Sequence, residues 1–398
     1  MRGRQVEQLR TRRQTRASVL GALLASGGLF RPRLAEACRL TEASISRIVA
    51  ELKQEALIEE IRRPAPYPGG PAQLVTLRKD LRLAGIEIAQ DHLSLAIAPP
   101  RGPADYAERL PLPASAPAER VQAVLGQGIA GLADWCARQG VAPRQIGVAI
   151  PGFRGVTGPR NPILALDPAW LEGRLAAAFP DVPVETASSI VARAALHLQA
   201  QGEAAEAAPR LFVHLGHGVG GAWLEPLRAG DPIRPIEIGH VVLDPKGPRC
   251  RCGHAGCLEA SASTTALARL FVVEEATLIA AGPDWPGCVR LTPARARTLR
   301  RVLRDVGLVI GNALNLLPGA QVVLSGWPAS LPPALRDGVA EGLDAALFGG
   351  VSPATPPVIF VPPLIGGGAA AAIAFATHAL LRRGGLPPLA GVAARLAG

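Results

Sequence analysis

Residues 237–259 read E-I-G-H-V-V-L-D-P-K-G-P-R-C-R-C-G-H-A-G-C-L-E, and they place one histidine ahead of three closely spaced cysteines. Thiolate and imidazole are the ligands that zinc prefers, and four of them close a tetrahedral structural site. Gly253 and Gly256 allow the tight turn that would bring Cys252 and Cys257 to one ion. We therefore expect a structural Zn²⁺ site with four ligands: His240, Cys250, Cys252 and Cys257.

Two alternatives to this ligand set follow from the same residues. His254 is a rival fourth ligand, but it sits inside the tight turn, so we favour His240. A disulfide is the other alternative, and it would be strained between cysteines as close as Cys250 and Cys252. The remaining cysteines, Cys38, Cys136 and Cys288, are scattered, and we expect them to be reduced.

Two carboxylates, Glu237 and Glu259, flank the metal motif, and spacing alone leaves their role open. They could support the zinc ligands or bind sugar hydroxyls. The block E-x-G-H followed by C-x-C-G-x-x-G-C-x-E resembles the signature of the ROK family (repressors, open reading frames and sugar kinases). The matching positions are Glu237, Gly239, His240, Cys250, Cys252, Gly253, Gly256, Cys257 and Glu259. The resemblance implies structural zinc in the His–Cys set, and sugar hydroxyls bound by Glu237, His240 and Glu259.

Charge is concentrated at the start of the chain. The 398 residues carry a net charge of +10, and residues 1–80 hold 15 Lys and Arg against 8 Asp and Glu. A basic segment of this kind favours a polyanionic partner such as DNA. The alternative is a solvated, arginine-rich surface.

Residues 1–80 predict a winged helix-turn-helix, with helices near residues 12–25, 31–38 and 42–55 and a hairpin wing that ends in a strand at 73–77. Pro32 suits the first turn of the second helix, and Thr41 can cap the third. On the third helix, Ile45, Ile48, Val49 and Leu52 form the inward stripe, and the outward set that would contact DNA is Thr41, Ser44, Ser46 and Arg47, with Lys53 beyond it.

The segment R-L-A-E-A-C-R-L-T-E-A-S-I-S-R-I-V-A-E-L, residues 33–52, resembles the DNA-binding segment of the ROK repressors. A small helical packing domain is the alternative. In those repressors the wing often carries Gly-Arg-Pro, whereas this chain has Gly69-Gly70-Pro71 and lacks that arginine.

The remainder reads as an α/β chain, because apolar strand candidates alternate with long Ala/Leu helices such as residues 121–138 and 298–317. Strand candidates are residues 84–89, 93–98, 146–150, 211–215, 322–324 and 358–361. The resemblance implies two actin-like (ribonuclease-H-like) lobes with a sugar cleft between them. We expect a DNA-binding domain at 1–80, a first lobe at 81–200 and a second lobe at 201–398, whose last helix can return to the first lobe.

Two segments imitate membrane signals. Residues 17–30 follow a basic start as a secretory signal would, and residues 364–381 lack charge over a spanning length. However, Val19, Leu20, Leu23 and Leu24 fall on one helical face, and the glycines and alanines of the later segment suit a buried helix. We expect a cytoplasmic protein with no membrane partner.

Kinase chemistry is where this chain departs from the family. ROK kinases open with Asp-x-Gly-Gly-Thr, and here the segment is Glu87-Ile88-Ala89-Gln90-Asp91, without either glycine. A second glycine-rich turn survives better at residues 215–221. The family's catalytic base is the Asp of Glu-Asn-Asp, where this chain has Ser188 and Ser189. Losing a general base typically costs about 10²–10⁴-fold in rate, so we expect no enzyme activity.

The leading hypothesis is a ROK-type transcriptional regulator that acts as a repressor and forms a homodimer or tetramer on a double-stranded DNA operator. It would sense a sugar or sugar derivative through Asn161, Ser188, Ser189, Glu237, His240 and Glu259. An ATP-dependent sugar kinase with an accessory DNA-binding domain is the alternative. A regulator that answers to a partner protein instead of a sugar is a third possibility.

Overall fold

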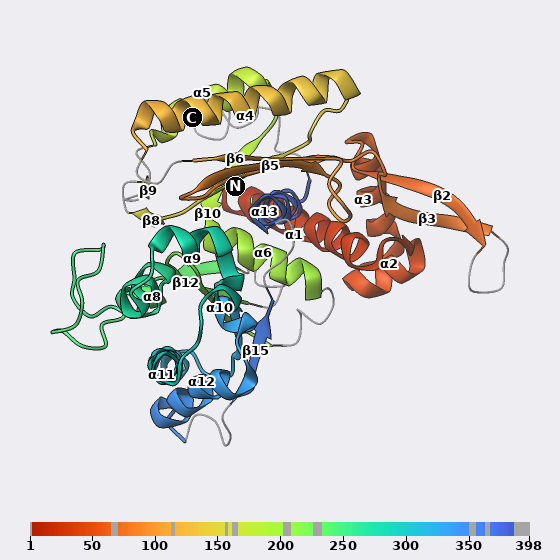
Figure 1. Ribbon diagram of the computed structural model, residues 1–398. Helices are drawn as coiled ribbons and strands as arrows, with labels where there is room; N and C mark the ends of the chain where they lie inside the picture. The colour runs from red at the N-terminus through yellow and green to blue at the C-terminus, as the bar shows by residue number, and fades with distance from the viewer. Residues whose placement is uncertain are drawn as a thin grey trace. The chain divides into compact units, whose positions relative to one another are not determined.

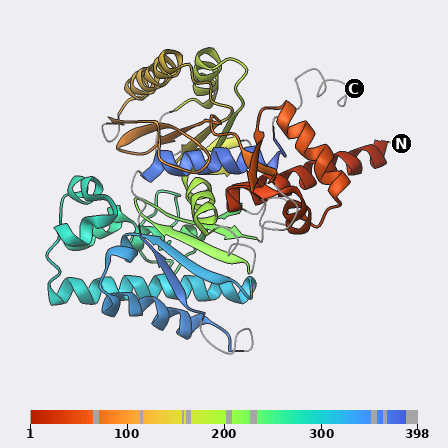
Figure 2. The same cartoon turned by 90° about the vertical axis from the view of Figure 1, so that its right-hand side faces the viewer.

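The computed structural model describes residues 2–64, 71–112, 116–155, 158–160, 166–201, 208–225, 233–349, 356–362 and 367–385. The chain forms two compact units (Figures 1 and 2). The first comprises Met1–Glu203 together with Gly368–Gly398, and the second comprises Ala204–Gly367.

The first unit begins with three helices and a small antiparallel sheet. These elements are α1 (Arg2–Ser26), β1 (Leu29–Phe30), α2 (Arg31–Cys38), α3 (Glu42–Gln54), β2 (Ile58–Pro64) and β3 (Pro71–Leu77), and the strand order is β1-β3-β2. The β2–β3 hairpin is the wing (Figure 1). This confirms the winged helix-turn-helix. Helix α1 starts ten residues before the predicted residue 12, because its first turns are polar and carry no apolar stripe to detect.

Local chemistry sets the start and the orientation of α3. The Thr41 hydroxyl accepts a hydrogen bond from the backbone N–H of Ser44 at 3.2 Å, which caps the helix as predicted. One face then packs into the core of the unit through Ile45, Ile48, Val49 and Leu52. On the opposite side, Thr41, Glu42 and Arg47 are exposed.

A five-stranded mixed sheet follows in the first unit. Its strands are β4 (Leu83–Ile88), β5 (His92–Ala98), β6 (Tyr106–Pro111), β7 (Ile146–Ile150) and β10 (Val184–Ser188). The order is β10-β7-β4-β5-β6, and the β4–β5 and β5–β6 pairs are antiparallel whereas β4–β7 and β7–β10 are parallel. A short β8 (Phe153–Gly155) pairs with β9 (Gly158–Arg160).

Helices cover both faces of this sheet. On one face, α4 (Ala118–Gln139) and α5 (Pro168–Ala178) share a hydrophobic cluster with the strands. On the other, α13 (Gly367–Arg382) packs in a cluster that also contains side chains of α1, α2 and α3. Helix α6 (Ser189–Gln201) continues directly from β10. The winged helix-turn-helix therefore shares one continuous core with the sheet and α13.

The second unit contains a sheet with the same strand pattern. Its strands are β11 (Arg210–Leu215), β12 (Val219–Leu224), β13 (Ile233–Ile236), β14 (Gln321–Gly326) and β15 (Val358–Val361), in the order β13-β12-β11-β14-β15. The first three pair antiparallel, and β11–β14 and β14–β15 are parallel. The repeated pattern of two hairpin pairings and two parallel crossovers is the duplicated architecture that the resemblance implies.

Helices of the second unit surround this sheet. They are η3 (Ile238–His240), α7 (Glu259–Ala262), α8 (Thr264–Phe271), α9 (Glu275–Ala281), η4 (Gly282–Asp284), α10 (Trp285–Cys288), α11 (Pro293–Leu316), η5 (Trp327–Ser330) and α12 (Pro333–Ala346). Helix α11 starts five residues before the predicted residue 298, because Thr292 caps it and Pro293 occupies its first turn.

Most of the two segments that imitate membrane signals lies in α1 and α13, and both helices bury apolar side chains in the first unit. Val19, Leu20 and Leu23 are at most 1% exposed, and α13 buries most of its alanines. Within the described ranges, no helix combines the length and the apolar character needed to cross a membrane.

Candidate functional site

The four predicted metal ligands come together in the second unit. The prospective ligand atoms of His240, Cys250, Cys252 and Cys257 all lie within 4.8 Å of one another. The Cys252 and Cys257 sulfurs are 3.6 Å apart, close to the roughly 3.8 Å edge of a tetrahedron of sulfurs at about 2.3 Å from zinc. All six cysteines are free thiols, which argues against the disulfide alternative. These donors fit Zn²⁺.

Short backbone contacts shape the cysteine loop. The backbone N–H of Cys250 donates to the His254 carbonyl at 2.8 Å, which holds the turn around Gly253. Gly256 has φ of 72°, and a Cβ there would lie 1.6 Å from the Asp244 carbonyl oxygen. Only glycine fits this position, so the spacing of the cysteines depends on it.

The His240 ring presents different nitrogens to its two neighbours. Its Nδ1 lies 3.7 Å from the Cys250 sulfur, and its Nε2 lies 4.0 Å from Glu237 Oε2. A ligating imidazole commonly has its other nitrogen facing a carboxylate, which orients the ring. His254 lies 3.6 Å from Cys252 but does not belong to the cluster of ligand atoms. The geometry therefore favours His240 as the fourth ligand.

The thiols of Cys252 and Cys257 differ in pKa. Burial raises the pKa of Cys252, but hydrogen bonds involving His254, Cys250 and Cys257 outweigh burial and lower that pKa to about 6. Burial and the neighbouring Cys252 raise the pKa of Cys257 to about 12. Cys252 is thus the thiolate of the pair near neutral pH, the form in which cysteine binds a metal.

Glu259 connects the metal loop to the glycine-rich turn between β11 and β12. Its Oε2 accepts a hydrogen bond from the backbone N–H of Val219 at 2.9 Å. A Cβ at Gly218 would lie 2.7 Å from the same oxygen, so the turn approaches the carboxylate closely. Its Oε1 lies 3.9 Å from the Cys250 sulfur. The sequence marked Glu259 as a candidate but offered no signal for these contacts.

The other predicted effector residues fall into two groups. Glu237, at the start of η3, keeps 58% of its side chain exposed and lies near His240 in the second unit. Ser188 ends β10 and Ser189 begins α6, both in the first unit. Within the described part of the chain, the buried Ser188 hydroxyl has no hydrogen-bond partner, which is a reason to expect a ligand atom there. Asn161 lies outside the described residues.

Near the end of β4, the Glu87 carboxylate is paired with Arg193 and lies close to His92. Its Oε1 accepts a hydrogen bond from Arg193 at 2.9 Å, and its Oε2 lies 3.7 Å from His92 Nε2. His92 Nδ1 lies 2.8 Å from Asp91. Burial raises the pKa of Glu87, but the His92 hydrogen bond and the Arg193 charge outweigh it, so this pKa lies below the usual value. The carboxylates of this segment are therefore neutralised internally.

The four residues predicted to contact DNA differ in exposure and in hydrogen-bond partners. Thr41 and Arg47 are exposed, and within the described residues Arg47 forms no hydrogen bond or ion pair. Ser44 is half-buried and accepts a hydrogen bond from the Thr41 hydroxyl at 3.0 Å. Ser46 is also half-buried and accepts one from Arg31 at 3.3 Å. Ser46 is turned toward α2, because Arg31 is held there by Glu60.

Two arginines on the wing are further candidates for DNA contact that the sequence analysis does not predict. Arg62 and Arg63 lie on β2 opposite Gln73 and Ala72, and both side chains are exposed. The wing residues Gly69 and Gly70 lie outside the described residues. The adjacent arginines before the proline-rich stretch were the available signal, and they put positive charge on the hairpin.

A model of the ROK family matches residues 83–372. The chain belongs to the ROK family. The ROK match covers both five-stranded sheets and the metal loop, and the winged helix-turn-helix lies ahead of it.

Two solved structures of ROK proteins resemble this chain, one over nearly its whole length and the other over three quarters of it. A structure described as a ROK family transcriptional regulator, homolog of E. coli MLC protein, aligns with a TM-score of 0.75 and 19% identity over 94% of this chain and 98% of that chain. A ROK hexokinase from Thermus thermophilus aligns with a TM-score of 0.56 and 22% identity over 75% of this chain and 99% of that chain. These likenesses establish the fold.

Curated relatives are N-acetylmannosamine kinases. The enzyme of Escherichia coli O1:K1 is 31% identical over 141 residues, which are 32% of this chain and 48% of that protein. The enzyme of Escherichia coli O139:H28 is 28% identical over 63% of this chain and 89% of that protein. This chain thus spans about half the length of the first of these ROK kinases, and the kinase likeness is distant.

Proposed function

We propose that this ROK protein is a DNA-binding transcriptional regulator of sugar-metabolism genes that acts as a repressor, similar in type to the family's N-acetylglucosamine and xylose repressors. One observation carries the proposal: α3 packs its apolar face inward and presents on the other face an exposed Thr41 and an Arg47 that has no hydrogen-bond or ion-pair partner among the described residues. A free guanidinium near the start of such a helix suits bidentate contact with guanine or with phosphate. The protein would act in the cytoplasm, where the DNA lies.

A carbohydrate effector is supported by the side chains kept from the family pattern. Glu237 and Glu259 offer carboxylates for hydroxyl groups, and the Ser188 hydroxyl is buried without a partner in the described residues. Serine hydrogen bonds are neutral, and neutral bonds are roughly half as strong as charge-assisted ones. We therefore propose a sugar or sugar derivative bound more weakly than a kinase binds its substrate, with Asn161, Ser189 and His240 as further contacts.

The zinc ion that we propose is structural. Its four ligands leave no open coordination position for catalysis, and its donor set is that of a closed tetrahedral site. It would hold the cysteine loop so that Glu259 and His240 keep fixed positions.

The kinase alternative is weakened at two places in the chain. Ser188 and Ser189 supply no carboxylate to take a proton from a sugar hydroxyl. Glu87 is held by Arg193 where the ROK kinases open their glycine turn. We therefore propose that the protein has no kinase activity, and a coupled phosphorylation assay separates the two functions.

Enrichment of specific duplexes from a random pool tests the proposed function as a DNA-binding regulator. The purified protein is incubated with a pool of random duplexes, and we expect it to enrich a two-fold symmetric site bound by a homodimer or tetramer. Arg47→Ala should weaken binding to that site by about 1–3 kcal/mol. Arg300→Ala is the control, because Arg300 forms an exposed ion pair with Glu341 in the second unit. Failure to enrich any sequence at low salt would contradict the proposed function.

A further inference from the structure

Helix α13 lies directly on the first sheet. A Cβ at Gly85 of β4 would lie 2.5 Å from the Ala369 carbonyl, and one at Gly147 of β7 would lie 2.3 Å from the Ala372 carbonyl. The helix backbone therefore rests on the strand backbones at two glycines, an approach that any side chain would prevent. Contact this close makes α13 a rigid part of the first unit.

The start of α13 is the place where the chain enters the first unit. The second unit ends at Gly367, and Gly368 already belongs to the first. A Cβ at Gly368 would lie 1.0 Å from Glu87 Oε2, so the Glu87 carboxylate packs against the helix N-terminus.

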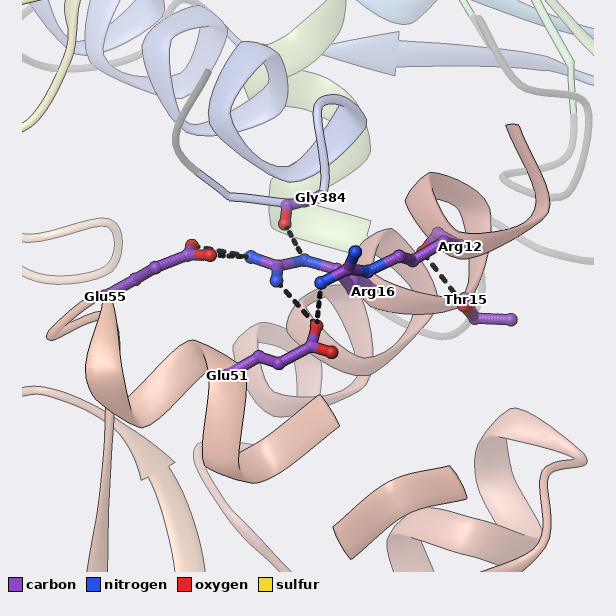
Figure 3. A network of polar contacts seen from close by, with 6 residues as sticks. All are labelled: Arg12, Thr15, Arg16, Glu51, Glu55 and Gly384. Carbon is purple, nitrogen blue, oxygen red and sulfur yellow. Dashed lines mark hydrogen bonds and ion pairs between the residues drawn. The ribbon is translucent and has the colours of Figure 1, made fainter. Parts of the chain in front are cut away.

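Two arginines of α1 bind the other end of α13. Arg13 Nε donates to the Arg382 carbonyl at 3.0 Å, and Arg16 Nε donates to the Gly384 carbonyl at 2.6 Å (Figure 3 for Arg16). The Arg382 carbonyl belongs to the last turn of α13, where carbonyls lack partners within the helix and carry partial negative charge, so the Arg13 guanidinium satisfies it. Gly384 has φ of 70°, and a Cβ there would lie 2.8 Å from the Arg13 carbonyl.

Arg16 connects this helix end to the recognition helix. Its Nη1 donates to Glu51 Oε2 at 2.9 Å and its Nη2 donates to Glu55 Oε1 at 2.6 Å, and the three groups converge in Figure 3. Glu51 lies on α3 and Glu55 follows its last residue. The Arg16 side chain is only 8% exposed. Burial raises the pKa of Glu51, but Arg12 and Arg16 outweigh it and hold that pKa below its usual value.

The candidate effector strand reaches the same helix end. Glu185 of β10 lies three residues before Ser188, and it pairs with Arg383 at 3.1 Å and with Arg382 at 3.4 Å. The carbonyl of Arg382 is the acceptor for Arg13. A path of ion pairs and hydrogen bonds to backbone carbonyls therefore runs from β10, through the end of α13, to α3.

We propose that Arg16 is a positioning residue that couples α13 and strand β10 to the recognition helix, so that a ligand at β10 changes the placement of α3. This inference rests on the proposed function for its biological meaning. Arginine is required because its planar fork serves one carbonyl and two carboxylates at once, whereas lysine offers a single point charge. Ligand binding can shift DNA affinity only through such differential contacts.

Hydrogen–deuterium exchange of the free protein tests the coupling without DNA. Arg16→Lys should speed amide exchange of residues 42–54 by about 5–30-fold, the change expected for a local loss of one or two interactions. Glu185→Gln should act in the same direction on the same residues, although among the described residues the ion pairs of Glu185 are with Arg382 and Arg383 and none is with α3. Arg300→Lys, in an exposed ion pair of the second unit, is the matched control and should leave this segment unchanged.

Affinity for DNA provides the second measurement. For a duplex that the wild type enriches from a random pool, Arg16→Lys should bind about 5–150-fold more weakly. Circular dichroism and unchanged exchange of residues 92–98, on β5 of the first unit, verify that the variants are folded. Folded Arg16→Lys and Glu185→Gln proteins with wild-type exchange in residues 42–54 would overturn the coupling. If the wild type enriches no duplex, the proposed function fails, and the exchange comparison still decides the coupling.

Discussion

Glu259 Oε2 accepts a hydrogen bond from the backbone N–H of Val219 at 2.9 Å. The contact ties the first residue of α7 to the first residue of β12, and the other oxygen of the same carboxylate lies near Cys250. One side chain therefore joins the metal loop to the glycine-rich turn. This connection means that metal occupancy and the shape of the turn should respond together.

Glu259→Gln should separate sugar binding from metal binding. The amide oxygen can still accept the hydrogen bond from Val219, but the charge is lost, so zinc content should stay unchanged while sugar affinity falls. Replacing a charge-assisted bond by a neutral one costs roughly half of its strength. Calorimetry with glucose, xylose, N-acetylglucosamine and N-acetylmannosamine, together with elemental analysis, measures both effects. A sugar that binds Glu259→Gln as tightly as the wild type would exclude this carboxylate from the sensor.

Cys252→Ser should remove zinc and destabilise the second unit. We expect one zinc ion per chain in protein purified without added metal, and a loss of several kcal/mol in the variant, because structural zinc contributes folding free energy directly. Cys288→Ser is the matched control, since Cys288 is exposed and lies outside the ligand cluster. A folded wild type with less than about half an equivalent of zinc would contradict the site.

Ser189→Asp should fail to create a sugar kinase. The substitution restores a carboxylate, yet Glu87 remains engaged by Arg193 and His92, and Ala89 and Gln90 still replace the two glycines of the kinase turn. A coupled assay with ATP and the same sugars should read background for the wild type and the variant alike. Turnover approaching the usual range of roughly 1–10³ s⁻¹ in the wild type would show that the kinase alternative is right.

The wing arginines should contribute to DNA affinity without sequence preference. Arg62→Ala and Arg63→Ala should each weaken binding to all duplexes and lower the slope of log affinity against log salt by about 1, because each guanidinium releases counterions from phosphate. Arg47→Ala should instead weaken binding mainly to the selected site. Filter-binding titrations at several salt concentrations distinguish the two patterns. Unchanged salt slopes in both wing variants would mean that the wing stays off the DNA.

Several features of this protein could be predicted from the sequence, because their causes are local. The short spacing of Cys250, Cys252 and Cys257 requires a tight loop that brings their sulfur atoms close together. The apolar stripe of α3 defines the buried face of that helix. The cap at Thr41 involves a residue only three positions away. Such short-range constraints are visible in the sequence, whereas the polar first turns of α1 carry no periodic signal that would predict a helix there.

Other features were decided only by the tertiary structure, because they join residues that no local pattern relates. Arg16 and Gly384 are 368 residues apart, and the fold alone brings the arginine to the end of α13. Ser46 was predicted to face outward from helical periodicity, but packing against α2 gives it Arg31 as a partner. Periodicity determines which residues share a face of a helix. What that face then meets depends on the free energy of packing the whole chain, so only the folded protein decides it.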